Sequence, residues 1–199
     1  MNRRGWVLMF IAASVLALVA LASNVTTVSQ LEGRANTLLA ARMTLSELVN
    51  AGALWAGLGV LSGWLVRGRA QAVVAGIIAL LTACVVHYGV GLALGMFDAG
   101  VWADNSSWFL AAVILGGPLG LVGAIARRPD GWGIGARLVV PVGAVIQPFY
   151  LGLFTTPAAL PWPDRAADFI TGLTLVTAGA TGGFWILATG RRQRGSGEP

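Results

Sequence analysis

The sequence has no lysine, one cysteine and one histidine, and only 11% of its 199 residues are charged. A soluble domain carries about 25% charged residues. The single cysteine, Cys84, excludes an internal disulfide and any metal site built on several cysteines. One histidine without a buried acid leaves too few ligands for a metal ion. We therefore expect no metal and no cofactor.

The sequence also lacks the local signatures of catalysis. There is no Walker loop, no HExxH, no GxSxG and no cluster of acids within an apolar run. We therefore expect that the protein is not an enzyme.

Hydrophobic residues make up 56% of the chain, and this apolar surplus predicts a bilayer environment. Each of six apolar runs is close to the 20 or so helical residues that cross a hydrocarbon core. Only helices satisfy every backbone group within such runs, so the sequence predicts an all-α bundle of six transmembrane helices. The predicted spans are residues 6–22, 48–66, 72–97, 108–126, 134–154 and 169–189.

The arginines set the predicted orientation. Ten of the thirteen arginines lie on the side of the membrane that both termini share, whereas six of the eight acids lie on the other side. By the positive-inside rule, both termini and the tail 190–199 are cytoplasmic. Because the arginines cluster beside apolar runs, the net charge of +5 does not indicate a nucleic-acid partner. The all-arginine composition, rich in alanine, glycine and valine, is typical of a GC-rich bacterium and predicts a multi-pass protein of the bacterial cell membrane.

Two segments at the start of the chain have more than one interpretation. The first run ends in Ala20-Leu21-Ala22, which resembles a signal-peptide cleavage site, but about 17 apolar residues exceed a signal core of 7–15. We interpret it as a retained span. Residues 27–45 have helical apolar spacing and a Thr27-x-x-Gln30 capping box, which predicts an amphipathic helix on the outer surface or capping the bundle.

Small residues recur in the second, fourth and sixth spans, each of which ends in closely spaced arginines. This pattern indicates three repeated helical hairpins, although any span that runs inward could end in the same way. Gly59-x-x-x-Gly63 and Gly179-x-x-x-Gly183 allow close helix contacts. We favour packing within the bundle over dimerisation or docking on a protein partner.

His87 and Gln147 are the clearest polar residues within the spans, and we expect both side chains in the central or outer part of the bundle. One interpretation makes them part of a solute site or proton path. The other makes them hydrogen-bonding residues that join helices. Pro141 and Pro148 flank Gln147, so we expect the fifth span to kink or break there, as helices do at transporter binding sites.

A candidate ligand pocket follows from these positions. It has His87, Tyr88, Gln147 and Tyr150 as lining residues, closed by Trp102, Trp108 or Trp162. The tryptophans equally fit an aromatic belt at the membrane boundary. The outer acids are interpreted as helix caps rather than a cation site, with Thr44-x-x-Glu47 as a capping box and Asp104 and Asp164 as N-caps.

Six short spans, both ends inside and a long first outer loop resemble the substrate-binding subunits of energy-coupling-factor transporters. In that family small residues on the first helix dock on a partner, and Ala13-x-x-x-Ala17 stands in a comparable place. The layout also resembles uncharacterised six-span membrane proteins of GC-rich Gram-positive bacteria. We therefore predict a membrane protein that binds or transports a small solute; the alternative is a non-catalytic structural or assembly subunit of a larger membrane complex.

Overall fold

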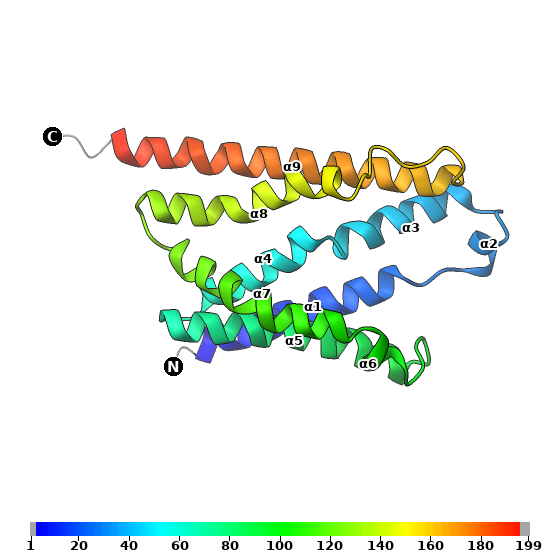
Figure 1. Cartoon of the computed structure of the whole chain (residues 1–199), viewed down its shortest axis with the longest axis horizontal. Coiled ribbons are helices and arrows are strands. Elements are labelled where there is room, and N and C mark those ends of the chain that lie inside the picture. The colour runs from blue at the N-terminus through cyan, green and yellow to red at the C-terminus, as the bar shows by residue number, and fades with distance from the viewer. Residues whose placement is uncertain (1–2, 196–199) are drawn as a thin grey trace. The chain divides into compact units, whose positions relative to one another are not determined.

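The computed structural model describes residues 3–195, gives only the backbone of residues 191–195, and has no β-strand in the described part. Its helices are α1 (Arg3–Ser23), α2 (Val28–Leu31), α3 (Asn36–Val49), α4 (Gly52–Leu65), α5 (Arg69–Ala93), α6 (Val101–Asp104), α7 (Ser106–Ile125), α8 (Gly131–Tyr150) and α9 (Trp162–Gly195) (Figure 1). The last four residues of the predicted tail 190–199 lie outside this part.

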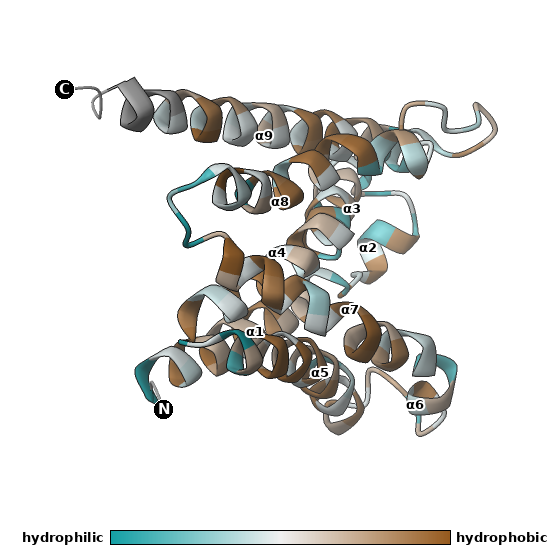
Figure 2. Cartoon of the chain, turned by 60° about the vertical axis from the view of Figure 1, so that its left-hand side comes forward, coloured by the Kyte–Doolittle hydropathy of each residue, from teal (hydrophilic) through white to brown (hydrophobic). Residues whose placement is uncertain are grey.

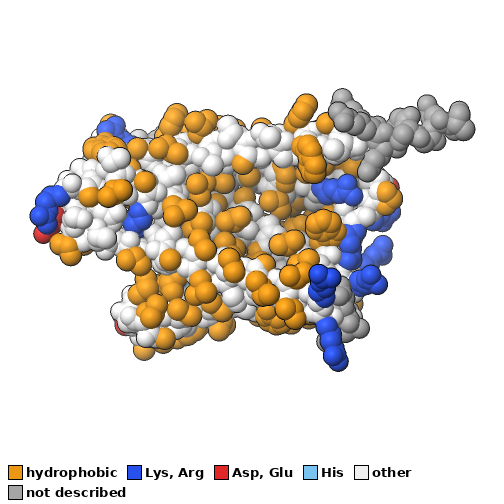
Figure 3. Space-filling view, turned by 180° about the vertical axis from the view of Figure 1, so that it is seen from behind, with side chains coloured by type: hydrophobic (Ala, Val, Ile, Leu, Met, Phe, Trp, Pro, Cys, Tyr) orange, Lys and Arg blue, Asp and Glu red, His pale blue; other side chains and the backbone are white. Residues whose placement is uncertain are grey.

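Six stretches are long and apolar enough to cross a membrane: Arg3–Ser23, Asn36–Leu65, Arg69–Ala93, Ser106–Ile125, Gly131–Tyr150 and Trp162–Gly190. The predicted all-α, six-span fold is confirmed, and the chain is a multi-pass integral membrane protein. Brown, the colour of hydrophobic residues, is frequent along α5 and α7 in Figure 2, and hydrophobic side chains are spread over much of the surface in Figure 3. Such surfaces match the lipid tails of a bilayer.

The helices form two compact units, which are described separately. Unit 1 contains α1, α5, α6, α7 and the part of α4 from Trp55 onward. Unit 2 contains α2, α3, the first turn of α4, α8 and α9.

Alanines form most of the core of unit 1, where α5 packs against both α1 and α7. Met9, Ala13 and Ala17 of α1 are fully buried, as is Ala79 of α5. Side chains this small allow the helices to approach closely, which is how membrane helices gain packing energy. Because Ala13 and Ala17 are covered, this pair does not offer the docking face that the family resemblance implied.

Glycines bring α4 and α5 into backbone contact with α7. A Cβ atom built on Gly63 would overlap the carbonyl oxygen of Gly120, and one built on Gly76 would overlap that of Gly116. In unit 2, a Cβ atom on Gly179 of α9 would lie 2.5 Å from the Pro141 carbonyl oxygen of α8. The prediction that these glycine motifs serve internal packing is therefore confirmed.

The two prolines of the fifth span do not break it. α8 runs without interruption from Gly131 to Tyr150 and contains Pro141 and Pro148. The sequence predicted a kink or a break here, and the break does not occur. Membrane helices tolerate proline because local adjustments and neighbouring groups satisfy the freed carbonyls. Pro118 likewise lies inside α7.

The break lies instead in the second span. This 30-residue stretch consists of α3 and α4, separated by Asn50 and Ala51. The predicted outer segment 27–45 is helical in two pieces, α2 and α3, divided by a turn at Gly33 with φ +72°. α3 packs against α9 in unit 2, as α8 does. The second span therefore begins earlier than predicted, at residue 36 rather than 48.

Glycine turns shorten two other spans. α5 ends at residue 93 and α8 at residue 150, although their apolar runs predicted ends at 97 and 154. Gly95 and Gly152 both have φ +70°, the left-handed conformation of a Schellman helix end. After α8, the Leu153 N–H donates to the Pro148 carbonyl at 2.9 Å. The same arrangement ends α5, and both ends share the sequence Leu-Gly-x-Phe.

Candidate functional site

His87 of α5 makes its hydrogen bond to the backbone of α1 in unit 1. The side chain is 7% exposed, and its Nδ1 lies 3.3 Å from the carbonyl oxygen of Ala17. Because a carbonyl oxygen only accepts, this bond places the proton on Nδ1. This contact joins α5 to α1 and matches the interpretation of His87 as a residue that hydrogen-bonds between helices.

Aromatic rings surround His87 and form what we call the aromatic cluster: His87, Tyr88, Phe97, Trp102 and Phe109. The ring centroids of His87 and Tyr88 are 5.0 Å apart, and those of His87 and Phe97 are 5.9 Å apart. The rings therefore pack on one another. Three predicted site residues come together here, and Phe97 and Phe109 complete the set.

Sequence reasoning missed both phenylalanines, although each has a local signal. Phe97 follows the Gly95 turn, which folds it back against α5. Phe109 lies next to Trp108 at the start of α7, where one helical position separates a ring facing the cluster from a ring facing outward.

Asn105 lies at the end of unit 1 where α6 is followed by α7. Its Oδ1 accepts from the Tyr88 hydroxyl at 3.1 Å, and its Nδ2 donates to the Val101 carbonyl of α6 at 2.9 Å. Asn105, not Asp104, occupies the N-cap position of α7. The predicted Asp104 cap is wrong by one residue, because the short helix α6 uses Asp104 as its last residue.

Gln147 of α8 contacts the break in the second span, within unit 2. Its Oε1 accepts from the backbone N–H of Ala53 at 2.9 Å. Ala53 is the second residue of α4, and the first N–H groups of a helix have no acceptor within it. A side chain from another helix thus caps α4. A Cβ atom built on Gly52 would lie 3.5 Å from the same Oε1, so glycine leaves space for this approach.

The remaining predicted site residues are exposed. Tyr150 is 86% exposed, Trp108 62% and Trp162 46%. Trp108 and Trp162 lie at the starts of α7 and α9, which suits the aromatic belt. Tyr150, Gln147 and Trp162 belong to unit 2, whereas the aromatic cluster and Trp108 belong to unit 1.

Glu47 and Asp164 of unit 2 do not occupy the helix-cap positions that the sequence predicted for them. Thr44 lies inside α3 and donates to the Ala40 carbonyl at 2.9 Å, so the predicted capping box with Glu47 is wrong. Glu47 lies beside Thr171 of α9 instead. Asp164 is in the first turn of α9, which begins at Trp162. No group of three histidine, cysteine or acidic side chains within residues 3–195 could hold a metal ion.

Asp168, a third acid of unit 2, joins α9 to the loop before it. Its Oδ2 accepts from the Thr156 hydroxyl at 2.6 Å. This bond anchors the proline-containing loop between α8 and α9 to the first turns of α9.

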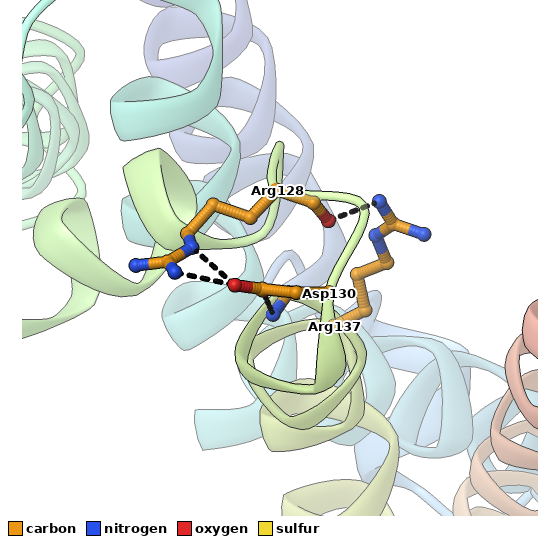
Figure 4. Close-up of polar contacts among 4 residues, drawn as sticks. Arg128, Asp130 and Arg137 are labelled. Carbon is orange, nitrogen blue, oxygen red and sulfur yellow. Dashed lines mark hydrogen bonds and ion pairs between the residues drawn. The ribbon is translucent and has the colours of Figure 1, made fainter.

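A charged loop precedes α8 (Figure 4). Asp130 caps the helix, because its Oδ1 accepts from the Gly133 N–H at 3.1 Å, and its Oδ2 pairs with Arg128. Arg137 donates to the Arg128 carbonyl at 3.1 Å. The hydrogen bond from Arg128, followed by those from the backbone N–H groups of Gly133 and Trp132, lowers the pKa of Asp130 below its ordinary value.

No family model, curated protein or solved structure matches the chain.

Proposed function

We propose that this membrane protein binds or transports a small solute, without catalysing a reaction, and that the solute contacts the α3–α4 break. The observation that carries the proposal is the hydrogen bond between Gln147 and the Ala53 N–H. A helix break inside a membrane span is tolerated where it is buried or lines a cavity. Broken helices of this kind form the substrate sites of many transporters.

The depth of the break agrees with a site in the outer half of the membrane. α4 has 14 residues from the break to its arginine-flanked end, or about 21 Å of helix. Gln147 is 16 residues beyond the start of α8, or about 24 Å. Both distances exceed half of a hydrocarbon core of about 30 Å.

The same contact suggests the class of solute. The N-terminus of α4 presents backbone donors and the positive end of the helix dipole. A carboxylate or carbonyl oxygen of a solute can replace Gln147 Oε1 at the Ala53 N–H, while the Gln147 amide donates to the same solute. We therefore infer a small solute that carries a carboxylate or carbonyl group.

A thermal-stability screen with small carboxylates and amides tests this proposal. A ligand at 100 times its Kd stabilises a folded protein by about 2.7 kcal/mol. We expect at least one compound to stabilise the wild type and the Thr177→Val variant, but not Gln147→Leu or Gln147→Asn. Thr177 is a suitable control because it is exposed on α9 and bonds its own helix, at 2.8 Å from the Leu173 carbonyl. A ligand that stabilises the Gln147 variants equally would exclude this site.

The second candidate is a non-catalytic subunit of a larger membrane complex. The aromatic cluster favours it, because rings packed at 5.0–6.4 Å fill the space that a ligand of unit 1 would occupy. His87 is also already bonded to Ala17. Under this candidate the polar residues fix helix packing, and a partner chain co-purifies with the protein in a fixed ratio.

A further inference from the structure

One end of unit 1 carries arginines without counter-charges. Arg3 and Arg4 begin α1, and Arg67 and Arg69 flank the Gly68 turn between α4 and α5. All four side chains are exposed, and none has a hydrogen-bond or ion-pair partner within residues 3–195. We call these four residues the arginine end.

The acids of unit 1 are far from the arginine end. They are Asp98 and Asp104, which follow the other end of α5. α5 has 25 residues, so roughly 37 Å of helix separates the two groups. This distance is several times the Debye length of about 8 Å at physiological salt. The positive charge of the arginine end is therefore uncompensated within unit 1.

A buried donor lies at the same end. The indole Nε1 of Trp6 is buried and has no hydrogen-bond partner. Trp6 packs against Val66, Ala72 and Ala75, which places it beside the Gly68 turn. An unpaired buried donor is costly and calls for a partner. Gln71 Oε1, in the first turn of α5, is likewise buried and unpaired.

Arg127 is engaged elsewhere and helps to build this end. Its guanidinium donates to the Trp64 carbonyl at 3.1 Å and also to the Val66 carbonyl. Carbonyl groups at the end of a helix such as α4 have no hydrogen-bond donor within the helix, and Arg127 supplies one to these two. The bond fixes the turn that carries Arg67 and Arg69, so the arginine end has a defined shape.

We propose that the arginine end binds the headgroup of an anionic phospholipid with headgroup hydroxyls, such as phosphatidylglycerol. The phosphate accepts from the Trp6 Nε1–H and from the guanidinium groups, and a headgroup hydroxyl donates to Gln71 Oε1. Val7 and Leu8, which follow Trp6 in α1, are 57% and 44% exposed and would contact the acyl chains. These apolar contacts distinguish a lipid from a soluble phosphate.

Native mass spectrometry of the full-length protein in detergent, titrated with phosphatidylglycerol or phosphatidylcholine, tests the proposal. We expect preferential binding of phosphatidylglycerol. Each arginine near an anionic lipid surface contributes about a fivefold factor in affinity, so Arg67→Gln combined with Arg69→Gln should lower it roughly 30-fold. Trp6→Phe keeps the ring and removes only the donor, and should lower it about tenfold.

The matched control removes the same charge elsewhere. Arg34→Gln combined with Arg165→Gln, in unit 2, should leave phosphatidylglycerol affinity within about twofold of wild type, because neither arginine belongs to the arginine end and exposed charges are screened by salt. Equal loss in the control would show a general charge effect and overturn the site. Equal binding of the two lipids, an unchanged Trp6→Phe variant, or displacement of the lipid by soluble glycerol phosphate would also overturn it.

Discussion

His87 and Gln147 both bond to the backbone of another helix, but the two backbone groups differ. Ala17 lies inside α1, where its carbonyl already accepts from the N–H four residues later. Ala53 lies in the first turn of α4, where its N–H has no acceptor in its own helix. Loss of Gln147 therefore leaves an unsatisfied group, whereas loss of His87 does not.

We expect Gln147→Leu to lower the free energy of unfolding by about 1–3 kcal/mol, the cost of an unpaired buried donor. His87→Phe keeps a ring in the aromatic cluster and should cost about 0.6 kcal/mol, the average for a polar contact between membrane helices. Denaturant unfolding in detergent micelles measures both. An equal loss of unfolding free energy in the two variants would contradict the argument that only the Ala53 N–H depends on a partner from another helix.

The Asp130 carboxylate gives a pH-dependent contribution. Its pKa is lowered in the folded protein, so it stabilises the fold above the unfolded pKa of about 4 and loses this effect as pH falls through the folded value. Asp130→Asn keeps a capping side chain and removes the charge. We expect its Tm deficit at pH 7 to shrink when Tm is measured below pH 4; a deficit that persists unchanged would show that the charge is not responsible.

At the scale of elements, backbone contacts between glycines hold α4 and α5 against α7. A methyl group at Gly63 would overlap the Gly120 carbonyl, and both partners are backbone atoms that cannot rotate away. Gly143 of α8 has nothing within 4 Å of its virtual Cβ atom. The two positions therefore form a matched pair of helical glycines, one in contact and one free of contact.

Gly63→Ala should destabilise the protein by about 1–3 kcal/mol through overpacking. Gly143→Ala should leave stability unchanged or raise it by up to about 1 kcal/mol, since alanine favours helix. Thermal unfolding of the two variants side by side is the measurement. A stable Gly63→Ala protein would mean that α4 and α7 are not in backbone contact.

The sequence predicts the elements well where one physical rule decides them. Apolar length identified all six spans, and small-residue spacing identified the glycine contacts. Apolar length did not predict the ends of α5 and α8, because a single glycine turn ends each helix inside its apolar run. These turns are at Gly95 and Gly152. Of the kink or break predicted at the prolines of α8, the break does not occur, because helix is the conformation that a membrane span can satisfy even around a proline.

The sequence predicted several residues of the candidate site, but not the groups that they contact. His87, Tyr88 and Trp102 do meet, because neighbouring positions on α5 face the segment that follows it. The partner of Gln147 was not foreseen. The break at Asn50 and Ala51 is marked only by the short sequence Asn-Ala-Gly, whereas the prolines of α8 gave the stronger local signal.

At the scale of the whole molecule, charge predicts the orientation. Within unit 1, five arginines lie at the end where α1 and α5 begin, and both acids lie at the other end. The positive-inside rule then places the arginines in the cytoplasm. This orientation stays a prediction, and it can be measured with single cysteines.

Cys84→Ser removes the one native thiol and allows Ala70→Cys and Ala99→Cys to be tested in turn. Both alanines are exposed; Ala70 is in the first turn of α5, and Ala99 is in the loop that follows the other end of this helix. In intact cells, a membrane-impermeant maleimide should label Ala99→Cys at once, and Ala70→Cys only after permeabilisation. The reverse pattern would invert the proposed topology.

The most direct test of the proposed function is native mass spectrometry of protein purified gently from its own membrane. A solute-binding protein should carry a small-molecule adduct in a fixed ratio. We expect that adduct to persist in Thr177→Val and to disappear in Gln147→Leu while the protein stays folded. A clean protein mass accompanied by a stoichiometric partner chain would contradict this account and assign the protein to a membrane complex.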